Sequence, residues 1–258
     1  MTEERTTTST QAALDIGLAT DVGRVREANE DALLALRPEG ARDGQVLVAV
    51  ADGMGGHKAG EVASALAVES LRQALQESEP SVSADALLTH ATQLANRTIW
   101  EAARVDLAKE GMGTTLVCAL LTADGHAVIA NVGDSRAYAF VGGAATLTTS
   151  DHTWVNEQVL SGQMSEQDAR SSPMRNLLTR ALGTTATVEV DVFDGLQLEV
   201  GDAVILVSDG VTGYLDEDDF TAVLHETATA QAAAERIVDA AVERGGADNA
   251  TAVVVRRQ

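Results

Sequence analysis

Aspartate recurs along this chain where an apolar stretch meets a loop. Asp52 and Asp209 directly follow the apolar runs VLVAVA and AVILVS, which are typical of central strands. Five stretches share the pattern: REANED (26–31), VADGMGGH (50–57), NVGDSRAY (131–138), VSDGVTG (207–213) and ADNATAVVV (247–255). A single Asp-Gly pair is more often a turn than a metal ligand, because both residues favour turns.

The shared context of these aspartates points to metal chemistry. Carboxylates gathered at the ends of strands repel one another unless cations neutralise them. Hard divalent cations with oxygen ligands supply that neutralisation. Two such ions, about 3.5 to 4 Å apart, can activate a bridging water and clamp a phosphoryl group during in-line displacement.

Composition limits the partners and the compartment. The chain has 39 acidic and 18 basic residues, and its formal net charge of −21 repels nucleic acids and anionic lipids. Cys118 is the only cysteine, so no intrachain disulfide can form and a cysteine-built zinc site is excluded. The sequence offers neither a signal-peptide core nor a membrane span, which takes about 18 apolar residues. We expect a cytoplasmic protein that binds neither nucleic acid nor membrane.

Short strands are predicted to position the aspartates. Apolar runs of strand length recur at 14–20, 32–37, 45–52, 113–121, 126–133, 135–141, 188–193, 203–209 and 250–255. DG and GG pairs lie between several neighbouring runs, and such short connections favour antiparallel hairpins.

Three longer stretches repeat apolar residues at helical spacing. The first begins after Gly60, the second spans roughly 84–108 and the third spans roughly 228–244. Strands in antiparallel runs with helices inserted in blocks favour an α+β fold over a doubly wound parallel sheet. We predict a four-layer α-β-β-α sandwich, in which helices flank two packed, mainly antiparallel sheets.

Two segments differ from this pattern. Residues 1–12 are polar, Thr-rich and without periodicity, which predicts a disordered tail. Residues 151–182 are also polar and hold Gly162 and Pro173, so we expect short helices outside the core that form a surface flap.

Seven motifs appear in order along nearly the whole chain, from about Leu14 to Arg256: RxxNED, VADGMGGHxAG, MGTT, GDSRAY, RNLLTRALG, VSDG and DNAT. In this order they resemble the protein phosphatase 2C family of metal-dependent serine/threonine phosphatases, in its short bacterial form. The resemblance implies that residues 13–258 form the catalytic domain. It further implies hydrolysis of phosphoserine and phosphothreonine by a water or hydroxide that bridges two Mn²⁺ or Mg²⁺ ions.

The resemblance also implies metal ligands. Asp52 should bridge both ions, with the carbonyl of Gly53 on the second ion. Asp209 and Asp248 should bind the first ion.

Three further acidic residues match the family. Glu30 and Asp31 stand where the family has acidic residues that contact the second metal or its waters. Asp134 matches an aspartate associated with a third, weaker metal, with a turn aspartate as the alternative. Many relatives carry another aspartate four residues after that of SDG, whereas this chain has Gly213. We therefore expect a vacant or weak third site.

Two residues match family positions that act on the substrate. Arg26 should fork onto the substrate phosphate, which suits a guanidinium, although it could be only a solvated arginine. His57 aligns with the histidine proposed as general acid to the leaving seryl or threonyl oxygen. Without the resemblance, a loop histidine that hydrogen-bonds a neighbour would be favoured. The surrounding glycines should allow close approach through a left-handed backbone.

Two other functions remain open. One is a catalytically weak or inactive relative that binds and regulates partners, although the chain keeps all three metal aspartates. The other is a phosphatase of a small phosphorylated transcription regulator. GxxxxGK[ST], HRD and DFG do not occur, which argues against a nucleotide loop and a kinase. We expect a monomer whose partners are phosphorylated proteins, including a serine/threonine kinase and its substrates.

Overall fold

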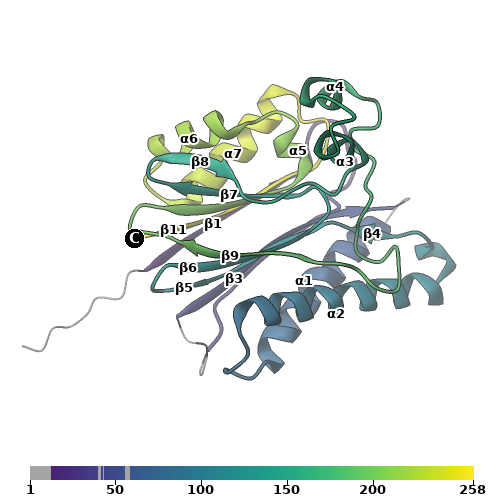
Figure 1. The fold of residues 1–258 in the computed structure, drawn as a ribbon, viewed down its shortest axis with the longest axis horizontal. Helices are drawn as coiled ribbons and strands as arrows, with labels where there is room; N and C mark the ends of the chain where they lie inside the picture. The colour runs from purple at the N-terminus through teal and green to yellow at the C-terminus, as the bar shows by residue number, and fades with distance from the viewer. Residues whose placement is uncertain (1–12, 40–41, 43, 56–58) are drawn as a thin grey trace, which may run out of the picture.

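The computed structural model describes residues 13–39, 42, 44–55 and 59–258. The predicted tail at 1–12 and His57 lie outside the described residues. Within them, two sheets pack face to face and helices cover both outer faces (Figure 1). The predicted α+β, four-layer α-β-β-α sandwich is confirmed.

The first sheet joins the two ends of the described chain. Its order is β1-β11-β10-β7-β8, and every neighbouring pair is antiparallel. The strands are β1 (Leu14–Asp21), β7 (Arg136–Val141), β8 (Ala144–Leu147), β10 (Ala203–Val207) and β11 (Ala250–Arg257).

The second sheet has the order β2-β3-β5-β6-β9, again antiparallel, and the two-residue β4 pairs with the end of β3. Its strands are β2 (Asp31–Leu36), β3 (Gln45–Met54), β4 (Gly113–Thr114), β5 (Leu116–Thr122), β6 (His126–Val132) and β9 (Asp191–Gln197).

Helices complete the outer layers. On the second sheet lie α1 (Ala59–Glu77) and α2 (Ala84–Val105), and on the first lie α6 (Glu217–Glu226) and α7 (Ala230–Arg244). The three predicted helices correspond to α1, α2 and α7. The second is shorter than predicted, since it ends at Val105 and a 3-10 helix follows at Leu107–Lys109.

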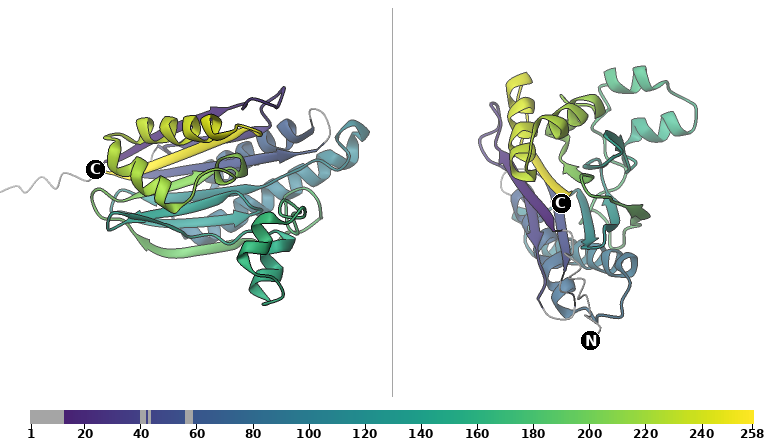
Figure 2. Two further views of the ribbon diagram at one scale, coloured as in Figure 1. Left: turned by 90° about the horizontal axis from the view of Figure 1, so that it is seen from above. Right: turned by 90° about the vertical axis from the view of Figure 1, so that its left-hand side faces the viewer.

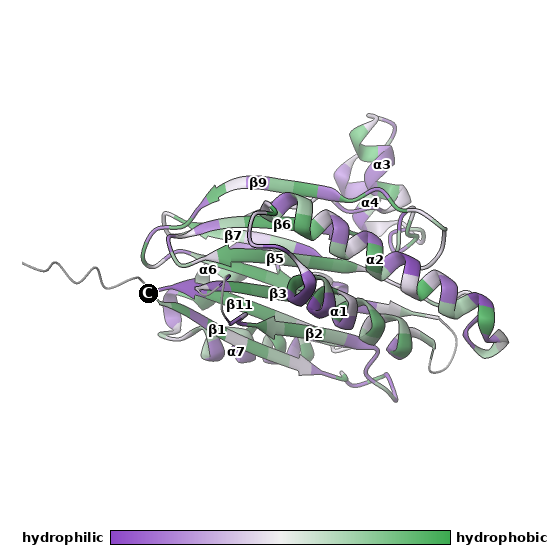
Figure 3. Cartoon of the chain, turned by 90° about the horizontal axis from the view of Figure 1, so that it is seen from below, coloured by the Kyte–Doolittle hydropathy of each residue, from purple (hydrophilic) through white to green (hydrophobic). Residues whose placement is uncertain are grey.

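The central strands are buried on both faces, which explains their continuous apolar runs. In β3, Val48 and Val50 face the other sheet, whereas Leu47 and Ala49 face α1 and α2. Figure 3 shows the apolar colour running along β3 and β5. A charged side chain cannot be buried on either face of such a strand at low cost. The aspartates therefore stand at the strand ends.

Further elements differ from the sequence prediction. The strand predicted at 188–193 begins instead at Asp191, because pairing with β6 starts at the Asn131–Asp191 pair near the end of β6. Val188 and Val190 still pack against the helical layer without strand pairing. Helix α6 and strand β8 were not predicted; α6 begins with a capping box formed by Asp216 and Asp219.

Residues 151–182, called here the flap segment, leave the first sheet after β8. They contain α3 (Trp154–Leu160) and α4 (Glu166–Ser171), which stand apart from both sheets (Figure 2, right). Isolated bridges Thr153–Leu178 and Thr114–Leu182 join the segment to itself and to the second sheet. In the described part of the chain, no helix combines the length and apolarity that crossing a membrane requires.

Candidate active site

A pocket of about 250 Å³ lies where both sheets present strand ends. Both sheets and the flap segment contribute to it, which brings together residues more than 200 positions apart in the sequence. Its lining is Arg26, Glu30, Asp52, Gly53, Met54, Gly55, Thr115, Asp134, Asn176, Leu178, Asp209 and Asp248.

Asp52 stands near the end of β3, directly opposite Asp31 at the start of β2. Like charges in such cross-strand pairs repel. Ser208 and Thr251 donate hydrogen bonds to Asp31 Oδ2 at 2.8 and 2.6 Å, which ties this carboxylate to the first sheet. Asp31 Oδ1 is buried without a partner. Asp31 thus lies behind the pocket lining rather than in it.

The backbone of Asp52 is fixed by the MGTT motif. Its N–H donates to Thr115 Oγ1 at 3.0 Å, and its carbonyl accepts from the Thr115 N–H at 2.9 Å. Thr115 Oγ1 also hydrogen-bonds Ser135 Oγ at 2.7 Å. The turn that carries Asp134 is therefore held against the strand end that carries Asp52.

Asp248 precedes β11 in a loop and pairs with an arginine. Arg26 Nη2 donates to Asp248 Oδ2 at 2.7 Å, and both side chains are partly exposed. Asn249 accepts from the Glu30 N–H at 2.8 Å and donates to the carbonyls of Val22 and Ala28. This asparagine fixes the β1–β2 loop, which carries Arg26 and Glu30, beside Asp248.

Close backbone packing explains the glycine at position 53. A Cβ on Gly53 would lie 2.2 Å from the Gly60 carbonyl oxygen and 2.6 Å from that of Glu30. The expected left-handed backbone occurs at Gly55, with φ of 145°, but not at Gly53. At position 53 glycine is required because another backbone approaches closely, not because of positive φ.

Electrostatics within the pocket favour protonated carboxyls. Burial and then the charge of Asp31 raise the pKa of Asp52, and burial and then Asp248 raise that of Asp209. Burial raises the pKa of Asp134 to about 7, with further increases from Asp209 and Asp151. Burial likewise raises the pKa of Asp31 to about 6 despite its two hydroxyl donors.

The pKa of Glu30 is also raised, first by burial and then by Asp248, although Arg26 opposes the shift. Among the described lining residues, five carboxylates face a single cation, Arg26, so part of this group binds protons. Divalent cations relieve the same repulsion without protons.

The donor set fits a hard divalent metal. It offers several carboxylates, and the orphaned Asp31 Oδ1 provides one more oxygen behind them. Among the described residues, however, no three acidic, His or Cys side chains already have the arrangement of a metal site. Arg26 Nη2 meanwhile engages one Asp248 oxygen in an ion pair at 2.7 Å.

The predicted site residues largely converge. The pocket lining includes Arg26, Glu30, Asp52, Gly53, Asp134, Asp209 and Asp248, while Asp31 lies behind it. His57 lies outside the described residues. Sequence reasoning did not single out Met54, Thr115, Asn176 or Leu178 as site residues, although they lie in the motifs VADGMGGHxAG, MGTT and RNLLTRALG.

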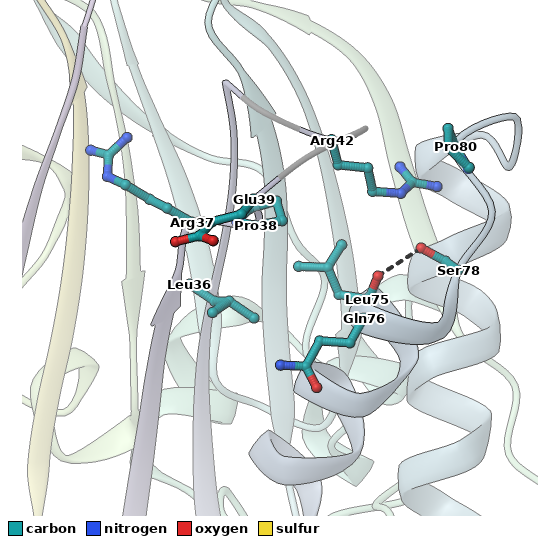
Figure 4. Close-up of a pocket in the computed structure, with 9 residues that line it drawn as sticks. All are labelled: Leu36, Arg37, Pro38, Glu39, Arg42, Leu75, Gln76, Ser78 and Pro80. Atoms are coloured by element: carbon teal, nitrogen blue, oxygen red, sulfur yellow. Dashed lines mark hydrogen bonds between the residues drawn. The ribbon is translucent and has the colours of Figure 1, made fainter.

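A larger hollow of about 490 Å³ lies between the β2–β3 region and the end of α1 (Figure 4). It has a single carboxylate in its described lining, that of Glu39. Its Arg42 already donates to the carbonyls of Glu79 and Val82 at 2.8 and 3.0 Å. Because its charges do not converge, this hollow lacks the chemistry of the smaller pocket.

Solved structures with the same fold define the class. The serine/threonine phosphatase of S. agalactiae superposes with a TM-score of 0.88 at 34% identity, covering 95% of this chain and all of that one. The catalytic domain of the serine/threonine phosphatase PstP in complex with two manganese ions gives a TM-score of 0.78 at 31% identity, covering 95% and 99%.

Sequence comparison then identifies the family. A family model described as protein phosphatase 2C matches residues 24–244. Serine/threonine phosphatase stp of Listeria monocytogenes is 39% identical over 241 residues, which cover 92% of this chain and 94% of that protein. The chain therefore belongs to the protein phosphatase 2C family of serine/threonine phosphatases, as the motif order predicts.

Proposed function

We propose that this protein removes phosphate from phosphoserine and phosphothreonine in proteins, with two Mn²⁺ or Mg²⁺ ions in the carboxylate pocket. The observation that carries the proposal is the convergence of Asp52, Asp134, Asp209 and Asp248 on one pocket with Arg26 at its side. The manganese pair in the related PstP domain supports the same assignment.

Asp52, Asp209 and Asp248 would hold the ions together with the Gly53 carbonyl. When bound, the metal pair supplies an activated water for attack on phosphorus and neutralises phosphoryl charge. Glu30 and Asp31 would orient waters or ligands around the second ion. Asp134 would serve a weak third ion.

Arg26 is proposed to bind the substrate phosphate. Its guanidinium, ion-paired with Asp248, is half exposed, with a side-chain exposure of 48%. Once a cation competes for Asp248, the guanidinium is free to fork onto two phosphoryl oxygens. His57 is proposed to protonate the leaving seryl or threonyl oxygen.

The biological setting follows from this chemistry. We propose phosphorylated proteins as partners, including a serine/threonine kinase and its substrates, and a cytoplasmic, monomeric enzyme. An inactive regulatory relative is disfavoured because every metal aspartate is present and lies at the pocket. A small phosphorylated transcription regulator is one possible substrate of the same site.

Turnover of matched phosphopeptides tests the proposal. Phosphoserine, phosphothreonine and phosphotyrosine versions of one peptide would be assayed with Mn²⁺, with Mg²⁺ and with chelator. We expect metal-dependent release of phosphate from the first two and much slower release from the third. A protein that binds Mn²⁺ yet hydrolyses none of them would be a binding relative, which would contradict the proposal.

A further inference from the structure

His152 begins the flap segment together with Asp151, and it is buried, with an exposure of 7%. Two hydrogen bonds join it to Gly133. The Gly133 N–H donates to His152 Nδ1 at 2.9 Å, and the His152 N–H donates to the Gly133 carbonyl at 3.0 Å. Gly133 immediately precedes Asp134, which lines the pocket.

These contacts assign the tautomer of the ring. Because Nδ1 accepts a hydrogen bond, the proton of the neutral ring lies on Nε2. Nε2 therefore donates to Asp191 Oδ2, 3.2 Å away. Arg180 lies 3.0 Å from the same nitrogen but donates to Asp191 Oδ1 at 2.5 Å. Burial, the largest influence, lowers the pKa of His152 and keeps the ring neutral.

The same residue also contacts the part of the flap segment that lines the pocket. The His152 carbonyl accepts from the Thr179 N–H at 2.9 Å, and the next residue, Thr153, bridges to Leu178. Leu178 lines the pocket, as does Asn176. His152 thus contacts the turn that carries Asp134 and the strand-like return of the flap segment at once.

A neighbouring ion pair holds the backbone beside His152. Arg136 donates two hydrogen bonds to Asp151, from Nε to Oδ1 at 2.8 Å and from Nη2 to Oδ2 at 2.7 Å. Asn156 Nδ2 donates to the Asp151 carbonyl at 2.7 Å. The start of the flap segment is therefore fixed on β7. The polar contacts of the His152 side chain are those of its two ring nitrogens, with Gly133 and Asp191.

We propose that His152 is a positioning residue that holds the Asp134 turn and the Asn176–Leu178 wall in register. It contacts neither substrate nor metal and acts on the pocket through Gly133 and Thr179. The inference rests on the proposed phosphatase function, because its effect on turnover depends on that pocket being the active site. The effect of His152 on the protection of backbone amides from hydrogen exchange does not depend on that function.

Two substitutions separate the two ends of the ring. In His152→Asn, the amide oxygen can take the place of Nδ1 and keep the bond from Gly133, while contact with Asp191 is lost. In His152→Gln, the longer amide can reach Asp191, but the Gly133 N–H loses its acceptor. Each variant removes one hydrogen bond of the ring, and the one to Asp191 is partly exposed, so the melting temperatures of both variants are measured alongside.

Hydrogen exchange and steady-state kinetics then distinguish positioning from general stability. We expect His152→Gln to speed exchange at 133–135 and 177–179 by about tenfold relative to His152→Asn, since an unpaired amide opens more readily. We also expect its KM for a phosphopeptide to rise several-fold, with KM for an aryl phosphate nearly unchanged.

The outcomes are separable. Equal exchange and equal KM values in the two variants would overturn the positioning role of His152. Faster exchange in His152→Gln without any change in KM would show a structural bond that does not serve the pocket, which also overturns the proposal. If the unsubstituted protein hydrolyses no phosphopeptide, the proposed function fails, while the exchange comparison still tests the register of the two walls.

Discussion

The pocket has a carboxylate wall, which contains Asp52, Asp134, Asp209 and Asp248, and a flap wall, which contains Asn176 and Leu178. The two walls are held in different ways. Asp52 and Asp209 emerge next to strands whose side chains are buried on both faces. Asn176 and Leu178 come from a polar segment that is attached through isolated bridges, the Arg136–Asp151 ion pair and a few hydrogen bonds. The wall that carries charge is thus continuous with the core, and the neutral wall is not.

We expect this difference to divide two tasks: the carboxylate wall serves metal binding and attack on phosphorus, and the flap wall serves the selection of substrates. Metal ions and an in-line attack demand fixed ligands, which a packed strand end can provide. A wall on a less supported segment can adapt to different substrates, since regions with few buried contacts open at low cost. Changes in the carboxylate wall should therefore affect turnover, and changes in the flap wall should affect KM.

The largest expected effect is at Asp52. Replacing it with Asn should lower kcat by at least about 10³-fold, or about 4 kcal/mol, because the carboxylate proposed to hold both ions would lose its charge. The control is Asp239→Asn on the exposed face of α7, which should have normal activity. Steady-state assays at saturating Mn²⁺ decide the matter, and near-normal activity of Asp52→Asn would remove Asp52 from the metal site.

The second prediction concerns pH and metal together. The pKa of Asp134 is about 7 and that of Asp31 about 6 in the folded state, against about 3.9 in an unfolded chain. Between these limits the folded state binds more protons, so the free energy of unfolding falls as pH rises from about 4 to 7. With chelator, the melting temperature should drop by several degrees over this range.

Saturating Mn²⁺ should restore most of that loss, because ions that bind only the folded state replace the protons that neutralise the carboxylates. Calorimetric scans at a series of pH values, with and without Mn²⁺, measure both effects. A metal-free melting temperature that rises steadily from pH 4 to 7 would contradict the assigned charge cluster.

The sequence anticipates the two walls unequally. Asp52 and Asp209 were predictable because an apolar run leads directly to each, and a charge there must lie at a strand end. Asn176 lies in the RNLLTRALG motif, but no apolar strand leads to it, and its place in the pocket depends on how the flap segment folds back through Leu178 and Thr153. The start of β9 was predicted too early for a related reason, since the strand begins where it pairs with the end of β6.

The third prediction tests selection by the flap wall. Asn176→Ala should raise KM for a phosphopeptide several-fold and leave kcat nearly unchanged, because this amide lines the pocket but carries no charge for the chemistry. Gln167→Ala on exposed α4 is the matched control within the same segment. If Asn176→Ala lowers kcat and spares KM, the division of labour between the walls is wrong.

The smallest expected effect is at Gly213, one helical turn after the pocket residue Asp209. This residue follows Asp209 by four positions, and its backbone is right-handed helical, with φ of −65° and ψ of −16°. A side chain there would lie on the same helix face as Asp209. Positive φ therefore adds no strain to a substitution, and the nearest atom to a new Cβ is the Asp209 carbonyl oxygen, at 3.3 Å.

Gly213→Asp should consequently strengthen the weakest Mn²⁺ binding step by a few-fold, because a second carboxylate would join Asp134. The tight contact with the Asp209 carbonyl offsets part of the gain, and Gly213→Ala carries the same contact without the charge. Titration calorimetry of the unsubstituted protein, Gly213→Asp and Gly213→Ala separates the effect of the added carboxylate on Mn²⁺ binding from the effect of the close contact. Three tight sites in the unsubstituted protein, or equal binding by the Asp and Ala variants, would show that the carboxylate wall is already complete without position 213.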